Sequence, residues 1–137
     1  MQIDWNEAYS VGVAEIDAQH QELIRRVNHL YGAIASGRGQ AEIGVTLNFL
    51  GEYVAWHFAS EEACMARHQC PIAEVNQTAH ATFIALFDTL RRRFEHDGPT
   101  ESLATDLQLQ ISAWIVNHIL RVDTHLRVCV SQANAND

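Results

Sequence analysis

The sequence is poor in positive charge. None of its 137 residues is a lysine, and nine arginines stand against 17 acidic residues, which gives a net charge of −8. An acidic surface repels nucleic acid and anionic lipid, so neither is an expected partner.

Long apolar runs and a targeting segment are also lacking. Although 47% of the residues are hydrophobic, no run approaches the roughly 18 apolar residues that a membrane span requires. Residues 1–16 do not show the basic start and apolar run of a secretory signal. We therefore predict a soluble, cytoplasmic protein of one domain with its own core.

Cysteine is scarce. Cys64, Cys70 and Cys129 are odd in number and form no C-x-x-C pair, which argues against a disulfide framework and against a zinc knuckle. They are expected to be free or buried thiols.

What the sequence does contain is a repeated helical pattern without strand signals. Apolar residues recur at steps of three and four in four stretches separated by Gly or Pro. Helices are predicted over about 17–37, 41–68, 72–96 and 101–129, after an extended arm (1–16) and with Asp17 as the first N-cap. Short turns predict an all-α, antiparallel up-down-up-down four-helix bundle over 1–130, and 131–137 is expected to be a polar tail or cut linker without regular structure.

Histidines and carboxylates interrupt the apolar stripes at matching places. His57 and Glu61 are four residues apart near the end of the second helix, so they share a face. His20 and His80 lie near the starts of the first and third helices, and His118 lies near the end of the fourth. In an antiparallel bundle these positions share one level.

A buried group of this kind is unfavourable without a metal. A single histidine on an apolar face is most often a satisfied core residue, but four of them with carboxylates would leave many polar groups unpaired, at roughly 1–3 kcal/mol each. Imidazole and carboxylate ligands without thiolate suit iron, manganese or zinc. The number of candidates exceeds one tetrahedral zinc site and favours two ions.

The helical wheel leaves some neighbours open. Asp123 follows His118 by five residues, about 140° on a regular helix, so the wheel does not decide whether it joins the group. Glu62 is about 100° from Glu61 and is expected to face outward. His68 is three turns beyond His57 and is expected at the surface.

At these residues the sequence resembles a bacterial hemerythrin domain. The resemblance extends over nearly the whole chain and rests on these residues: Trp5, Tyr9, Val11-Gly12-Val13, Ile16-Asp17, Gln19-His20, His57-Phe58, Glu61-Glu62, Met65, Pro71, His80, Trp114, His118-Ile119-Leu120 and Asp123. It implies two irons bridged by Glu61, Asp123 and a solvent-derived oxo or hydroxo group. It further implies that His20 and His57 complete one iron, and that His80 and His118 bind the other.

In one place the sequence departs from that family. The family has His-x-x-x-His at the start of the third helix, but Asn76 stands at the first of these positions. Asn76 is expected to offer a weak amide oxygen, to leave a position for water, an anion or another small ligand, or to be a polar residue without a metal role. Rescue by His68 would require the preceding turn to fold back.

The resemblance implies O2 binding without enzymatic turnover. Trp114, Ile115 and Val122 are candidates for the wall of an apolar O2 pocket, or are ordinary core residues. Because one imidazole is missing, we predict fast autoxidation and hence an O2 or redox sensor, the regulatory part of a larger signalling protein with a linked output domain. The alternative is a stand-alone O2 carrier. A di-iron oxidase of the ferritin-like kind is disfavoured, since no Glu precedes a His by three residues.

Overall fold

The chain folds almost entirely into helices. The computed structural model describes residues 1–136, with side chains up to residue 131, and no strand occurs in this part. The elements are η1 (Glu7–Tyr9), α1 (Ala14–Ala35), α2 (Gly39–Arg67), α3 (Ala73–Asp97), α4 (Glu101–His118), the π-helical turn η2 (Ile119–Asp123) and α5 (His125–Asn136). None of the described helices has the length and apolarity needed to cross a membrane. The predicted all-α class is confirmed.

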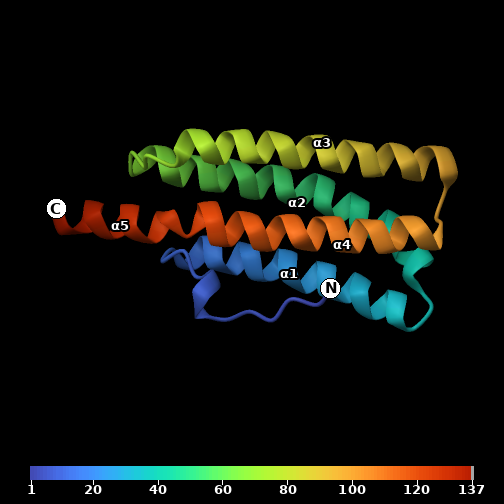
Figure 1. Cartoon of the computed structure of the whole chain (residues 1–137). Coiled ribbons are helices and arrows are strands. Elements are labelled where there is room, and N and C mark those ends of the chain that lie inside the picture. Colours follow the sequence, from blue (N-terminus) through green and yellow to red (C-terminus); the bar gives the residue numbers. More distant parts are fainter. Residues whose placement is uncertain (137) are drawn as a thin grey trace.

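The helices form an antiparallel up-down-up-down bundle, as predicted. α1 packs against α2 and α4, and α3 packs against the same two helices from the other side. The α1–α2 and α3–α4 connections lie at one end and the α2–α3 turn at the other (Figure 1). α4, η2 and α5 follow one another in a single column, and α5 projects past the end where the α2–α3 turn lies (Figure 1).

The N-terminal arm is anchored differently from our expectation. α1 begins at Ala14, so Asp17 is not its N-cap but lies inside its first turn. The Asp17 carboxylate instead accepts hydrogen bonds from the Val11 N–H at 2.8 Å and from the Ser10 hydroxyl at 2.6 Å. The arm is thereby held against the start of α1.

The segment after residue 130 is helical rather than irregular. α5 continues through Asn136, so a helix extends into the segment that we predicted as a polar tail or cut linker, and Asp137 lies outside the described residues. The start of α5 is packed, since Leu126 is fully buried and Cys129 nearly so. A helix that has already begun gains one hydrogen bond for each residue added, so it extends into a segment that lacks an apolar stripe.

The cysteines also differ from prediction. Cys70 and Cys129 form a disulfide, and only Cys64 is a free, buried thiol. The two bonded cysteines are 59 residues apart. They meet because the helical column brings α5 beside the α2–α3 turn, which local cysteine spacing does not reveal.

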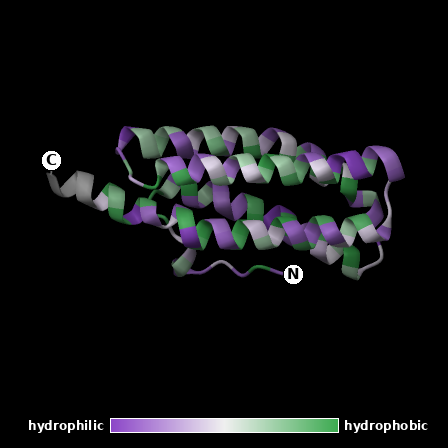
Figure 2. Ribbon diagram, turned by 45° about the horizontal axis from the view of Figure 1, so that its top comes forward, coloured by the Kyte–Doolittle hydropathy of each residue, from purple (hydrophilic) through white to green (hydrophobic). Residues whose placement is uncertain are grey.

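Two apolar clusters fill the interior, and a polar level separates them. Along α2, Phe58 belongs to the larger cluster and Cys64 to the smaller one, with Glu61 between them. The same order holds in the last column, where Asp123 lies between Ile119 and Leu126. Figure 2 shows polar and apolar residues alternating along each helix. Any group at this level is therefore sealed from both ends.

Candidate metal centre

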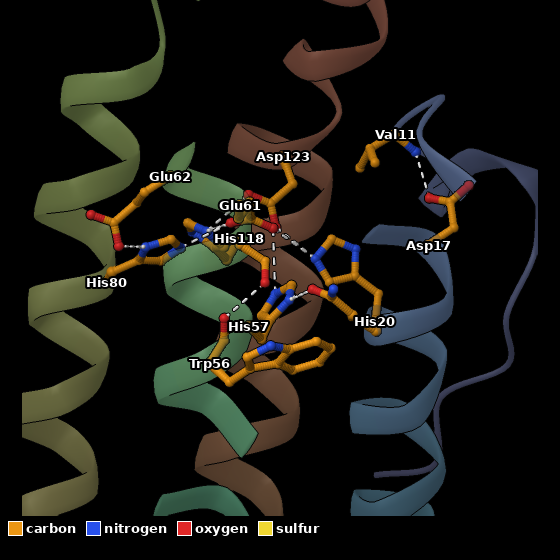
Figure 3. Close-up of polar contacts among 12 residues, drawn as sticks. Val11, Asp17, His20, Trp56, His57, Glu61, Glu62, His80, His118 and Asp123 are labelled. Carbon is orange, nitrogen blue, oxygen red and sulfur yellow. Dashed lines mark hydrogen bonds and ion pairs between the residues drawn. The ribbon is translucent and has the colours of Figure 1, made fainter. Parts of the chain in front are cut away.

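Six buried histidine and carboxylate side chains meet at this polar level (Figure 3). α1, α2, α3, α4 and η2 each contribute, and every one of the six is at most 5% exposed. The six are His20, His57, Glu61, His80, His118 and Asp123. The structure thus brings together all of the residues expected there.

Glu61 occupies the middle of the group, and its two oxygens face opposite sides. Oε2 lies 2.9 Å from His20 Nε2 and 3.4 Å from His57 Nε2. Oε1 lies 2.9 Å from His80 Nε2 and 3.7 Å from His118 Nε2. One carboxylate therefore contacts two separate pairs of imidazoles.

Asp123 repeats this arrangement from the last column of helix. Its Oδ2 lies 3.1 Å from His20 Nε2, and its Oδ1 lies 3.0 Å from His118 Nε2. The two carboxylates thus run side by side between the same two sides of the centre.

The π-helical turn η2 explains how Asp123 reaches the group. Its hydrogen bond runs from the Thr124 N–H to the Ile119 carbonyl at 3.0 Å, a step of five residues. A π turn takes up one more residue than an α turn, and such turns occur often at functional sites. The five-residue step from His118 to Asp123 therefore returns to nearly the same face.

The donor atoms form two sets that suit metal ions. The first set is Glu61, His80, His118 and Asp123, the second is His20, His57 and Glu61, and the donor atoms within each set lie within 4.8 Å of one another. His118 Nε2 and both Asp123 oxygens are close to one another or to His20, but among the described residues none of these contacts has the geometry of a hydrogen bond. Because buried polar atoms are normally paired, these unpaired donors fit a cation between them.

Polar residues behind the imidazoles fix the ring orientation. His57 Nδ1 lies 2.6 Å from Gln19 Oε1. His80 Nδ1 lies 3.2 Å from Glu62 Oε2 (Figure 3). With Nδ1–H donated outward, each Nε2 is free to face the centre, the arrangement common for metal-bound histidine. Glu62, which we expected to face outward, is half-buried and contacts His80. Gln19 is among the residues that carry the resemblance, but its contact with His57 was not predicted.

The carboxylates and imidazoles shift one another's protonation. Burial alone would lower the pKa of His20, but contacts with Asp123 and Glu61 outweigh it and raise the pKa to about 9. The same opposed causes raise the pKa of His118 to about 9. Burial lowers the pKa of His57 to about 3 despite the Glu61 charge. Burial and the Glu61 charge raise the pKa of Asp123, so in the absence of cations the centre holds protons.

Aromatic rings cover the side of the centre that faces the larger apolar cluster. Phe58 stacks on His80 with ring centroids 3.7 Å apart, and Trp114 stacks on His118 at 4.3 Å. Ile115 is buried in the same cluster, whereas Val122 is half-buried in η2. Phe58 went unrecognised as a covering residue, although it directly follows His57.

Asn76 lies one turn before His80 on α3 and has no exposed surface. Neither its amide nitrogen nor its amide oxygen has a hydrogen-bond partner among the described residues. His68 does not replace it, because its Nδ1 lies 2.9 Å from the Cys64 carbonyl oxygen at the end of α2. His68 is half-buried rather than at the surface as expected.

A four-helix bundle that buries two facing sets of imidazole and carboxylate donors belongs to the metal-binding class of bundles. The profile of the family described as "Hemerythrin HHE cation binding domain" matches residues 11–127. The chain belongs to the hemerythrin family.

Several bacterial relatives support this assignment, each named bacteriohemerythrin. One from Stenotrophomonas maltophilia is 30% identical over 84% of this chain and 72% of its own length. One from Methylococcus capsulatus is 31% identical over 93% of this chain and 95% of its own length. One from Pseudomonas aeruginosa is 29% identical over 87% of this chain and 75% of its own length.

Proposed function

We propose that the polar level binds two iron ions and uses them to detect O2. His20 and His57 would hold one iron, and His80 and His118 the other. Glu61 and Asp123 would bridge them together with a solvent-derived oxygen. The split of both carboxylates between the two sides supports a pair of ions over a single one.

The bound irons would supply reversible O2 binding and the electrons for it, and the protein would supply position and shelter. Gln19 and Glu62 hold the rings of His57 and His80 in place. Phe58 and Trp114 cover the imidazoles on the apolar side, and Ile115 and Val122 are the further candidates for the pocket wall. Exclusion of water from this side would slow loss of electrons from the centre.

Asn76 is the observation that favours a sensor over a carrier. It is buried with both amide atoms unpaired, at the position where the family places a third imidazole for the second iron. We propose that this iron is left open to water or a small anion, or bound weakly by the amide. Oxidation by O2 would then be fast, as suits a regulatory domain of a signalling protein.

Metal analysis and rapid mixing test this proposal. Two irons per chain are expected, and one zinc per chain would contradict the iron pair. Mixing the diferrous protein with O2 should give a short-lived absorption change followed by the diferric spectrum. An O2-dependent spectrum stable for many minutes would contradict the sensor.

Substitution of Asn76 tests the open position directly. Asn76→His should slow autoxidation and weaken binding of a small anion such as azide, because it fills the open position. Asn76→Ala is the matched control and should retain both properties. If Asn76→His leaves the autoxidation rate and azide affinity unchanged, Asn76 does not set them.

A stand-alone O2 carrier or store is the second candidate. The match to the Methylococcus capsulatus relative favours it, because the alignment covers 95% of that protein's length. That bacteriohemerythrin therefore has no large region outside the part that this chain matches. The same rapid-mixing experiment separates the two, because a carrier must keep its O2 adduct.

A further inference from the structure

The Cys70–Cys129 disulfide connects the α2–α3 turn to α5. Cys70 is held in this turn by its N–H, which donates to the Met65 carbonyl at 2.9 Å. Gln69 adopts a left-handed conformation with φ of 53°, which closes α2 in a Schellman-type cap. Cys129 lies in the second turn of α5, so the bond joins a fixed turn to the helix that projects from the bundle.

This bond lies close to the metal level along the chain. Cys70 precedes Asn76 by six residues, and Cys129 follows Asp123 by six. Both cysteines belong to the small apolar cluster that seals this end, together with Leu126 and the free thiol of Cys64. Any change at the disulfide is therefore close to two positions of the second iron.

The disulfide is also within reach of a reductant. Cys70 and Cys129 are only 5% and 8% exposed, but both line a surface pocket of about 280 Å³. Pro71, Ile72, His125 and Val128 complete the lining, and Val128 is well exposed. A small dithiol has space to approach the bond without unfolding of the bundle.

We propose that the Cys70–Cys129 disulfide is a second, reversible redox site that clamps α5 to the bundle. A dithiol donor is the expected reductant. One donor thiolate attacks one sulfur, giving a mixed disulfide and releasing the other cysteine as a thiolate that takes up a proton. The second donor thiol then displaces the first cysteine, leaving two protein thiols and an oxidised donor.

Loss of the bond leaves α5 with weaker anchors. Leu126 remains packed, and the Arg127 guanidinium still donates to the Ser10 carbonyl of the arm. Both anchors lie in the first turn of α5, and beyond Arg127 only the apolar contacts of Cys129 and Val130 with the small cluster remain among the described residues, so this part of the helix is held more weakly. The clamp thus controls α5 through thiol chemistry, independently of whether O2 binds at the metal level.

Thiol counting under native conditions tests the reversible site. The metal-loaded chain is equilibrated with mixtures of reduced and oxidised dithiothreitol or glutathione and quenched in acid. It is then denatured and alkylated, and the number of labelled cysteines is read from its mass by mass spectrometry. One labelled cysteine is expected in the oxidised chain and three in the reduced chain, in a single step with the helical circular dichroism retained. A count that stays at one until denaturant is added during the equilibration would overturn the proposal.

Hydrogen exchange tests the clamp. On reduction, amides of residues 128–131 should exchange about tenfold faster or more, whereas those of α1 stay unchanged. Cys70→Ser in oxidising buffer should match the reduced chain, and the matched control Cys64→Ala should match the oxidised one. Equal exchange of α5 in oxidised and reduced wild-type chains would contradict the clamp even if Cys70→Ser fails to fold.

Discussion

The imidazoles on the two sides of the centre are supported by different residues. Behind His57 lies the neutral amide of Gln19, and behind His80 lies the carboxylate of Glu62. A carboxylate acceptor makes an imidazole a more basic ligand than an amide does. The extra negative charge therefore lies on the side of the centre where the buried Asn76 precedes His80 by one turn of α3.

Replacing Glu62 with Gln should weaken metal binding on that side. Glu62→Gln keeps the size of the side chain but removes the charge that supports His80 Nδ1–H. We expect the affinity of the centre for a divalent ion such as Zn²⁺ to fall by about tenfold or more, measured by competition with a chelator.

The matched control is Glu52→Gln, also on α2 but exposed to solvent. It removes the same charge from the chain without touching the centre, so its affinity should equal that of the wild type. If both variants bind Zn²⁺ equally well, Glu62 has no part in holding His80.

The difference between the predicted and observed surroundings of His80 has a simple physical cause. The spacing of His57 and Glu61 on one helix face is visible in the sequence, because helical periodicity carries it. Glu62 points away from that face, yet its long side chain reaches His80 on the neighbouring helix. A helical wheel records the direction of Cα–Cβ and not the reach of the side chain.

Among the elements, the π-helical turn is the one that periodicity does not predict. A regular helix places Asp123 about 140° from His118, and only the extra residue taken up in η2 brings its Oδ1 to 3.0 Å from His118 Nε2. The turn depends on the tertiary packing of α4, η2 and α5, so the local sequence pattern does not decide whether Asp123 faces the centre. The position of α5 and the Cys70–Cys129 disulfide could not be predicted from local patterns either, because both depend on contacts with the turn that follows α2.

The arm and α1 form a second element-scale contact, carried by Asp17. Asp17→Ala removes the acceptor of the Ser10 and Val11 hydrogen bonds and should lower the free energy of unfolding by roughly 1–2 kcal/mol. Urea unfolding measures this loss, and hydrogen exchange should become faster in the arm before it does so in α2.

Glu15→Ala serves as the control, because Glu15 is also an acidic residue in the first turn of α1 but is exposed. It removes the same favourable interaction with the helix dipole without releasing the arm. Equal losses for the two variants would mean that charge, not the arm contact, accounts for the effect of Asp17.

On the scale of the whole molecule, the bundle was predictable because four amphipathic stretches with short turns have few ways to bury their apolar faces. The same antiparallel order places groups from the start of one helix beside groups from the end of the next. The polar level and its four histidines were therefore predictable from sequence, whereas their protonation depends on the mutual distances in the folded chain.

The shifted pKa values of the three histidines together favour a stability maximum of the metal-stripped protein near pH 6.5. Between pH 6.5 and about 9, the folded chain holds protons on His20 and His118 that the unfolded chain has released, so a rise in pH destabilises the fold. Between about 3 and 6.5, the unfolded chain takes up a proton on His57 that the folded chain excludes, so a fall in pH destabilises the fold. The lowered pKa of Glu61 acts in the same direction, and the raised pKa of Asp123 opposes it.

Each of these histidines should change the free energy of unfolding by on the order of 3 kcal/mol across its window. Urea unfolding of the chelator-treated protein at a series of pH values measures both limbs. In the metal-loaded protein the alkaline limb should disappear, because ligation holds His20 and His118 without protons at Nε2 throughout. Equal stability of the stripped protein from pH 6.5 to 9 would mean that Asp123 and Glu61 do not keep His20 and His118 protonated. Both imidazoles would then be neutral, as metal ligands must be, even before metal binds.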